Sequence, residues 1–159
     1  MNIRPATPSD VPAILGLIRE LAEYEHLTHA CIATEALLTE HLFGPERAAE
    51  ALVAEREQKV VAYALYFKTF STFLARPGIY LEDLYVQPAH RRQGIGKALL
   101  RHLAKIATTC GYGRVEWSVL DWNSPSIAFY KSLGALPLEE WTMFRLTGEA
   151  LEAFATNEK

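Results

Sequence analysis

The spacing of hydrophobic residues along the chain switches between a period of two and a period of three to four, which predicts alternating strands and helices. A first helix is predicted over residues 7–25. Thr7 and Asp10 have the spacing of a capping box, with Asp in place of the usual Glu, and Pro8 suits the first helical position. The apolar stripe of this helix consists of Val11, Ile14, Leu15, Ile18, Leu21 and Ala22.

Strands are predicted where short apolar or alternating runs lie between turn residues. They are NIRPA (2–6), EALVAERE (50–57), KVVAYALYFK (59–68), GIYLEDLYV (78–86), RVEWSVL (114–120) and WTMFRL (141–146). The second and third runs are joined by a short polar turn around Gln58, so we expect them to form a hairpin.

Four further helices complete the pattern. One is predicted over 34–43 and another after Gly94. A third spans 124–134, with Ser124 as its N-cap and Pro125 at its first position. A terminal helix is predicted to start near Thr147. Strands that alternate with helices and are interrupted by a hairpin imply an α/β fold with a mixed sheet and helices on both faces.

Length and composition favour a single domain over residues 1–159, because the chain is half apolar and 22% charged. A net charge of −3 argues against a nucleic-acid partner, which usually requires a basic surface. No segment resembles a secretory signal or approaches the roughly 20 apolar residues of a membrane span. Cys31 and Cys110 match no metal or redox spacing, and the histidines show no metal-binding pairing. This pattern favours free thiols, no metal and a cytoplasmic location.

The segment RRQGIG (91–96) stands between a predicted strand and a predicted helix. A helix N-terminus offers free N–H groups and a positive dipole end, and glycines let an anion approach the backbone closely. Arg91, Arg92 and Lys97 add positive charge. A phosphate-bearing ligand is one interpretation, and a tight turn with solvated arginines is the other. The pattern is neither a Walker loop nor a dinucleotide fingerprint, whose third glycine is replaced by Leu99.

RRQGIG is similar to the R/Q-x-x-G-x-G/A signature of the GNAT N-acetyltransferases, whose loop holds the pyrophosphate of acetyl-CoA. The segments IRPAT, LIRELAEYE, YLEDLYV and DWNSPSIAFYKSLGA resemble, in the same order, the diamine (spermidine/spermine) acetyltransferases and their thialysine-acetylating relatives. The resemblance runs from Ile3 to about Leu146. It implies a mostly antiparallel sheet of six or seven strands, in which strands 78–86 and 114–120 splay apart and hold the pantetheine arm.

The resemblance also implies where acetyl-CoA binds: at the backbone of one strand, in the glycine-containing loop and at the NSPS turn. The residues carried over are Leu84, Tyr85, Val86, Arg92, Gln93, Gly94, Ile95, Gly96, Lys97, Asn123, Ser124, Pro125 and Ser126.

Two side chains are expected to act in catalysis. An alkyl amine, whose pKa is ~10.4, must lose a proton before it attacks the thioester. The resemblance implies that Glu82 lies beside the thioester, so Glu82 is the candidate that takes this proton, directly or through water. Alternation along the strand predicts that Glu82 and Asp83 lie on opposite faces. The family places a tyrosine hydroxyl near the sulfur, and Tyr130 is the matching acid for the departing thiolate. A backbone N–H between Leu84 and Val86 is expected to stabilise the developing oxyanion.

The acceptor amine is expected to bind at Tyr24, Glu25 and Glu82, because relatives bind it with the matching Tyr-Glu pair. Glu20 and Glu23 are interpreted as an ordinary exposed helix end. The segment FKTFSTFLARPG (67–78) contains no carboxylate, whereas polyamine-preferring relatives carry an acid there. This departure leaves a thialysine-like amino acid, a short diamine or another small amine as candidates ahead of spermine.

Other classes remain open from the sequence. A non-catalytic acyl-CoA-binding module or sensor would keep RRQGIG without needing Glu82 and Tyr130 together, and a generic nucleotide-binding domain is disfavoured by the missing third glycine. Direct transfer in a ternary complex is preferred over an acyl-enzyme, because neither cysteine adjoins the predicted cleft. The resemblance alone implies a homodimer, to which residues 141–146 are a candidate contributor.

Overall fold

The computed structural model describes residues 1–156. These residues divide into two compact units, Met1–Ser118 and a second unit that begins at Val119. The first unit contains the sheet and α1 to α3, and the second contains α4 and α5.

The sheet of the first unit has five strands in the order β1-β2-β3-β4-β5. Strands β1 to β4 are antiparallel neighbours, and β5 pairs parallel to β4. The predicted mixed, mostly antiparallel sheet is therefore confirmed, although the described residues form five strands instead of six or seven. The strands are β1 (Asn2–Pro5), β2 (Glu50–Arg56), β3 (Lys59–Ser71), β4 (Arg76–Val86) and β5 (Val115–Trp117).

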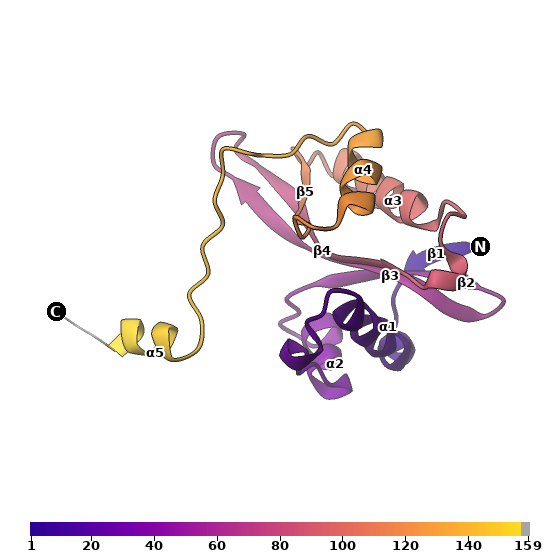
Figure 1. Cartoon of the computed structure of the whole chain (residues 1–159), viewed down its shortest axis with the longest axis horizontal. Helices are drawn as coiled ribbons and strands as arrows, with labels where there is room; N and C mark the ends of the chain where they lie inside the picture. The colour runs from indigo at the N-terminus through magenta and orange to yellow at the C-terminus, as the bar shows by residue number, and fades with distance from the viewer. Residues whose placement is uncertain (157–159) are drawn as a thin grey trace. The chain divides into compact units, whose positions relative to one another are not determined.

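Helices cover both faces of this sheet, as predicted (Figure 1). One face carries α1 (Val11–Tyr24) and α2 (Glu35–Phe43), and the other carries α3 (Ile95–Thr109). The α1 face is held by a core cluster that includes Ile14 and Leu17 of α1 together with Val53, Tyr63 and Tyr85 of the sheet. Short 3-10 turns precede or connect the helices: η1 (Pro8–Asp10), η2 (Thr28–Ala30) and η3 (Pro88–His90).

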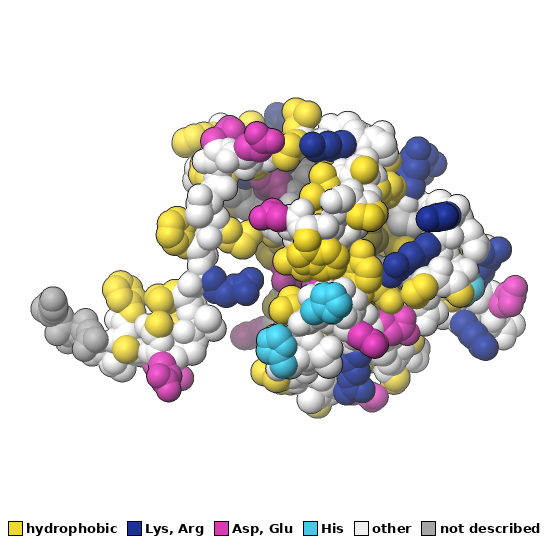
Figure 2. Space-filling model, in the orientation of Figure 1, with side chains coloured by type: hydrophobic (Ala, Val, Ile, Leu, Met, Phe, Trp, Pro, Cys, Tyr) yellow, Lys and Arg dark blue, Asp and Glu magenta, His cyan; other side chains and the backbone are white. Residues whose placement is uncertain are grey.

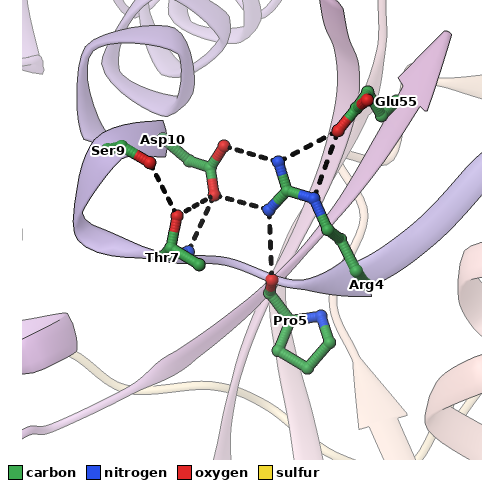
Figure 3. Close-up of polar contacts among 6 residues, drawn as sticks. All are labelled: Arg4, Pro5, Thr7, Ser9, Asp10 and Glu55. Carbon is green, nitrogen blue, oxygen red and sulfur yellow. Dashed lines mark hydrogen bonds and ion pairs between the residues drawn. The ribbon is translucent and has the colours of Figure 1, made fainter. Parts of the chain in front are cut away.

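A buried carboxylate ties the first strand to the start of α1 (Figure 3). Asp10 accepts hydrogen bonds from both terminal nitrogens of Arg4 at 2.7 and 2.9 Å and from the backbone N–H of Thr7 at 2.7 Å. Arg4 also pairs with Glu55 of β2. The hydrogen bonds from Arg4, followed by those from Thr7, lower the pKa of Asp10 to about 2. The predicted capping box of Thr7 and Asp10 is confirmed.

The hairpin between β2 and β3 turns at the predicted place. Glu57 and Gln58 both have positive φ angles, 50° and 62°, as the tight turn between paired strands requires. β3 then runs to Ser71, three residues beyond the predicted strand end, and pairs with β4 from Ala62 to Ser71.

The second unit contains α4 (Ser124–Ser132) and α5 (Gly148–Thr156). The N-cap of α4 is Asn123, whose side-chain oxygen accepts from the backbone N–H of Ser126 at 3.3 Å. The expectation that Ser124 is the cap was therefore wrong by one residue. The terminal helix begins at Gly148, beside the predicted start.

The predicted strand 141–146 is not formed in the described chain. Apolar residues dominate this segment, but a strand also needs a neighbour for its backbone N–H and C=O groups. Trp141, Met143 and Phe144 are 73%, 67% and 91% exposed. Figure 2 shows hydrophobic side chains uncovered along this segment and on α5.

Candidate functional site

The glycine-containing loop between η3 and α3 has the backbone shape of an anion-binding turn. Arg92 and Gly94 both adopt left-handed conformations, with φ angles of 60° and 79°. Successive N–H groups in such a turn converge on one side and can bind an anion. Gly94 is the N-cap of α3 and provides no side-chain cap, so the first turn of α3 can offer its N–H groups to a ligand.

The side chains of this loop divide into two groups. Arg92 and Lys97 are exposed. Gln93 is engaged within the protein, because its amide nitrogen donates to the carbonyl of Ala89 at 3.3 Å and its oxygen accepts from Arg56. Arg91 is also engaged: its Nε donates to the carbonyl of Val86 at 2.9 Å. The cationic side chains best placed for a phosphate are therefore Arg92 and Lys97.

The end of β4 has one backbone edge without a strand beside it in the first unit. β5 pairs with β4 only over Ile79–Leu81, whereas β4 continues to Val86. The N–H of Gln87 donates to Val61 of β3 at 3.0 Å. Because backbone groups in an antiparallel pair alternate between the two edges, those of Leu84 and Val86 face the open edge, and those of Tyr85 face β3. The splaying of strands 78–86 and 114–120 stays a prediction, because β5 ends at Trp117.

A β-bulge lies at Glu82. Leu65 of β3 is paired with Asp83 and the next residue, Tyr66, is paired with Leu81, so Glu82 is the extra residue on β4. A bulge interrupts side-chain alternation and redirects the side chains beside it. Strict alternation does not apply at this bulge, so the expected placement of Glu82 and Asp83 on opposite faces stays a prediction. Glu82 is exposed, and its charge acts on Asp83.

Asp83 belongs to a partly buried group of carboxylates below the bulge. It accepts a hydrogen bond from the hydroxyl of the buried Tyr63 at 2.9 Å. Burial raises the pKa of Asp83, the Tyr63 hydrogen bond opposes this, and the charge of Glu82 adds to it. Burial also raises the pKa of Glu25, with a further contribution from Asp83. Three carboxyl groups thus interact electrostatically, an arrangement that favours binding of a cation.

The sequence analysis identified Glu25 and Glu82 in this group but missed Asp83 and Tyr63. No sequence pattern indicates Asp83 or Tyr63, because their arrangement depends on a bulge, and the bulge depends on how β4 pairs with β3. Glu20, which was interpreted as an ordinary exposed position, is instead half-buried. It accepts from the hydroxyl of Tyr85 at 3.2 Å and from the amide of Gln87 at 2.8 Å.

The remaining predicted site residues belong to the second unit. Asn123 is buried and begins α4, followed by Ser124, Pro125 and Ser126 in its first turn. Tyr130 is half-buried on the same helix, with its ring 5.4 Å from that of Phe129.

Within residues 1–156, no group of three or more His, Cys, Asp or Glu side chains has the arrangement of a metal site. Cys31 and Cys110 are free thiols. None of the helices in the described part of the chain is long and apolar enough to cross a membrane.

The fold and the loop define a class of protein. The family model described as "Acetyltransferase (GNAT) family" matches residues 17–135, about three quarters of the chain. The chain therefore belongs to the GNAT acetyltransferase family. The predicted family, fold class and N-acetyltransferase class are confirmed.

Individual relatives agree with this assignment over nearly the whole chain. A thialysine N-epsilon-acetyltransferase of Mus musculus is 40% identical over 97% of this chain and 96% of its own length. An L-ornithine N5-acetyltransferase of Arabidopsis thaliana is 36% identical over 96% of this chain and 86% of its own length. Among solved structures, an integron cassette protein from the mobile metagenome of V. cholerae is 28% identical, with a TM-score of 0.83 over 98% of both chains.

Proposed function

We propose that this protein uses acetyl-CoA to acetylate the side-chain amine of a small amino acid, such as thialysine or ornithine, by direct attack in a ternary complex. The observation that carries the proposal is a group of interacting carboxyl groups: Glu82 and Asp83 at the β4 bulge, directly before the open backbone edge of β4, and Glu25 at the end of α1. This arrangement joins a cation-binding site to a segment that can bind an acyl thioester.

The donor site would use the backbone more than side chains. The N–H groups from Gly94 to Lys97 and the side chains of Arg92 and Lys97 would bind the pyrophosphate. The open-edge backbone of Leu84 and Val86 would bind the pantetheine arm, and one of these N–H groups would donate to the thioester oxygen as negative charge develops. The Asn123–Ser126 turn is proposed as a further CoA contact.

The acceptor enters as an ammonium ion and must become neutral before it attacks. Glu82, which the bulge leaves exposed, would accept its proton directly or through water. Asp83 and Glu25 would hold the ammonium in place before the transfer. The amine nitrogen then attacks the thioester carbon, the C–S bond breaks, and the hydroxyl of Tyr130 protonates the CoA thiolate.

The acceptor class is supported from two directions. The segment 67–78 contains no carboxylate and carries Lys68, whose ammonium group lies 5.9 Å from the centre of the Tyr112 ring. A long polycation would gain no attraction from this segment. The relatives are named for thialysine and ornithine, which are compact and carry one side-chain amine.

We further propose that residues 1–159 form one acetyltransferase domain, that two copies form a homodimer and that the protein is cytoplasmic. The family match from residue 17 to 135 spans both compact units and supports a single domain. The uncovered apolar side chains of the second unit, including Trp141 and Phe144, support self-association.

A two-part assay tests the proposed activity. Acetyl-CoA should raise the melting temperature, whereas NAD and ATP should not, because the loop lacks their motifs. Release of CoA should then require a small amine. Stabilisation by acetyl-CoA without amine-dependent CoA release would instead support the non-catalytic acyl-CoA sensor. Equal stabilisation by ATP would support a generic nucleotide-binding domain.

A further inference from the structure

Arg91 is the first residue of RRQGIG, yet its side chain binds other protein groups. Its guanidinium carbon lies 5.0 Å from the centre of the Tyr24 ring and 5.4 Å from the centre of the Tyr85 ring. Its Nε donates to the carbonyl of Val86 at 2.9 Å. Guanidinium is planar and can contact aromatic faces while it donates a directed hydrogen bond, which the ammonium group of lysine cannot do equally well.

These contacts join three segments: the end of α1, the end of β4 and the loop before α3. Tyr24 is the last residue of α1, and Glu25 follows as its C-cap. Tyr85 lies at the end of β4 and donates to Glu20 of α1. Arg91 belongs to the loop before α3. One side chain therefore connects the loop proposed to bind the donor with the end of α1 proposed to bind the acceptor.

We infer that Arg91 is a positioning residue for the acceptor site and not a phosphate ligand. Its guanidinium holds the Tyr24 ring against the loop, and the backbone of Tyr24 continues directly into Glu25. Loss of the guanidinium frees the last turn of α1, so that Glu25 is held less firmly beside Asp83. This inference rests on the proposed function for the identity of the two sites.

A comparison of two acetyl donors shows whether Arg91 positions the acceptor site or binds a phosphate. S-acetylpantetheine carries the same thioester as acetyl-CoA but lacks the adenosine and its phosphate-bearing link to the pantetheine arm. Arg91→Ala, Arg91→Lys and the matched neighbour Arg92→Gln are each assayed with both donors and with the best amine. A phosphate ligand affects only acetyl-CoA, whereas a positioning residue affects the reaction with both donors.

We expect Arg91→Ala to raise the amine KM roughly 2- to 30-fold, the factor that corresponds to the interaction energy of a cation–π contact. The increase should be similar with either donor. Arg91→Lys should recover only part of this loss. Arg92→Gln should lower kcat/KM for acetyl-CoA and affect S-acetylpantetheine much less. A loss in Arg91→Ala that is confined to acetyl-CoA, with an unchanged amine KM, would overturn the inference.

A second measurement does not depend on activity. Unfolding of wild type, Arg91→Ala, Tyr24→Leu and the double variant forms a double-mutant cycle. We expect a coupling between the two residues of roughly 2- to 30-fold in the unfolding equilibrium constant. Additive effects would refute the contact. If the wild type acetylates no amine, the proposed function fails on its own, and this cycle still decides whether Arg91 positions α1.

Discussion

At the residue scale, Asp83 is a carboxyl group held in an unfavourable environment for its charge. Burial and the charge of Glu82 raise its pKa, and the hydrogen bond from Tyr63 opposes them. A carboxyl group whose pKa is higher in the folded state than in the unfolded state reduces stability as pH rises through the interval between the two values. Retaining Asp83 at this position is a cost to stability that binding of a cationic substrate would offset.

The raised pKa of Asp83 predicts how a substitution at this position changes stability at different pH values. We expect Asp83→Asn to raise the melting temperature near pH 7 and to change it much less near pH 3.5, below the ordinary pKa of an aspartate. The same variant should raise the amine KM, because one carboxylate of the cation site is lost. Melting curves at several pH values test this, with the exposed Glu40→Gln as a control. Destabilisation by Asp83→Asn at neutral pH, with an unchanged amine KM, would contradict the assigned role.

Tyr130 provides a second prediction at this scale. Tyr130→Phe keeps the ring beside Phe129 but removes the proposed proton donor to the thiolate. General acid catalysis contributes about 10²- to 10⁴-fold, and we expect kcat to fall toward the lower end of this range, because a thiol of pKa ~8.5 is already a fair leaving group. Acetyl-CoA affinity and stability should change little. Cys110→Ala, measured with saturating acetyl-CoA, should retain nearly full turnover. Turnover near wild type in Tyr130→Phe would show that the ring has a packing role only.

At the element scale, the start of α3 decides donor binding. Gly96→Asp should preserve the fold, because replacing a helical glycine and adding an acid to the first turn both favour the helix. Its carboxylate would nevertheless repel the pyrophosphate, so the KM for acetyl-CoA should rise roughly tenfold or more. Gly16→Asp, on the exposed surface of α1, adds the same charge elsewhere and serves as the control. Unchanged acetyl-CoA affinity in a folded Gly96→Asp variant would move the donor site away from this loop.

At this scale, the sequence predicted the features that depend on neighbouring residues, but it did not predict the features that depend on pairing between strands. The capping box of Thr7 and Asp10 and the turn at Gln58 depend on neighbouring residues, and both were predicted correctly. The bulge at Glu82 depends on the register with β3, and the sequence did not predict it. The start of α4 offers two adjacent residues that can cap a helix; Ser124 was predicted as the cap, and the structure has Asn123 in this role.

The predicted strand 141–146 failed for a related reason. The segment is a short, mostly apolar run, but such a run cannot show whether a neighbouring strand is available to pair with it. This segment and α5 leave large apolar side chains exposed in the described chain, among them Trp141, Met143, Phe144 and Phe154.

At the scale of the whole molecule, these exposed side chains lead to a prediction about assembly. We expect light scattering to give a dimer for the wild type. The double variant Trp141→Asp/Phe144→Asp should raise the dissociation constant roughly 100-fold or more, since buried aromatic anchors dominate most interfaces. Leu37→Asp on α2, which removes an exposed apolar side chain from the first unit, should leave the dimer intact. A wild type that stays monomeric at high concentration would refute the dimer proposal.

The central claim is that this GNAT protein acetylates a compact amine at the carboxylate group of the β4 bulge. The most direct measurement is kcat/KM with acetyl-CoA for thialysine, L-ornithine, a short diamine, spermine and a lysine-containing peptide, with each product identified by its mass. We predict that thialysine or L-ornithine gives the highest value, that spermine ranks below them, and that the peptide is acetylated least. The highest kcat/KM for spermine or for the peptide would contradict the claim.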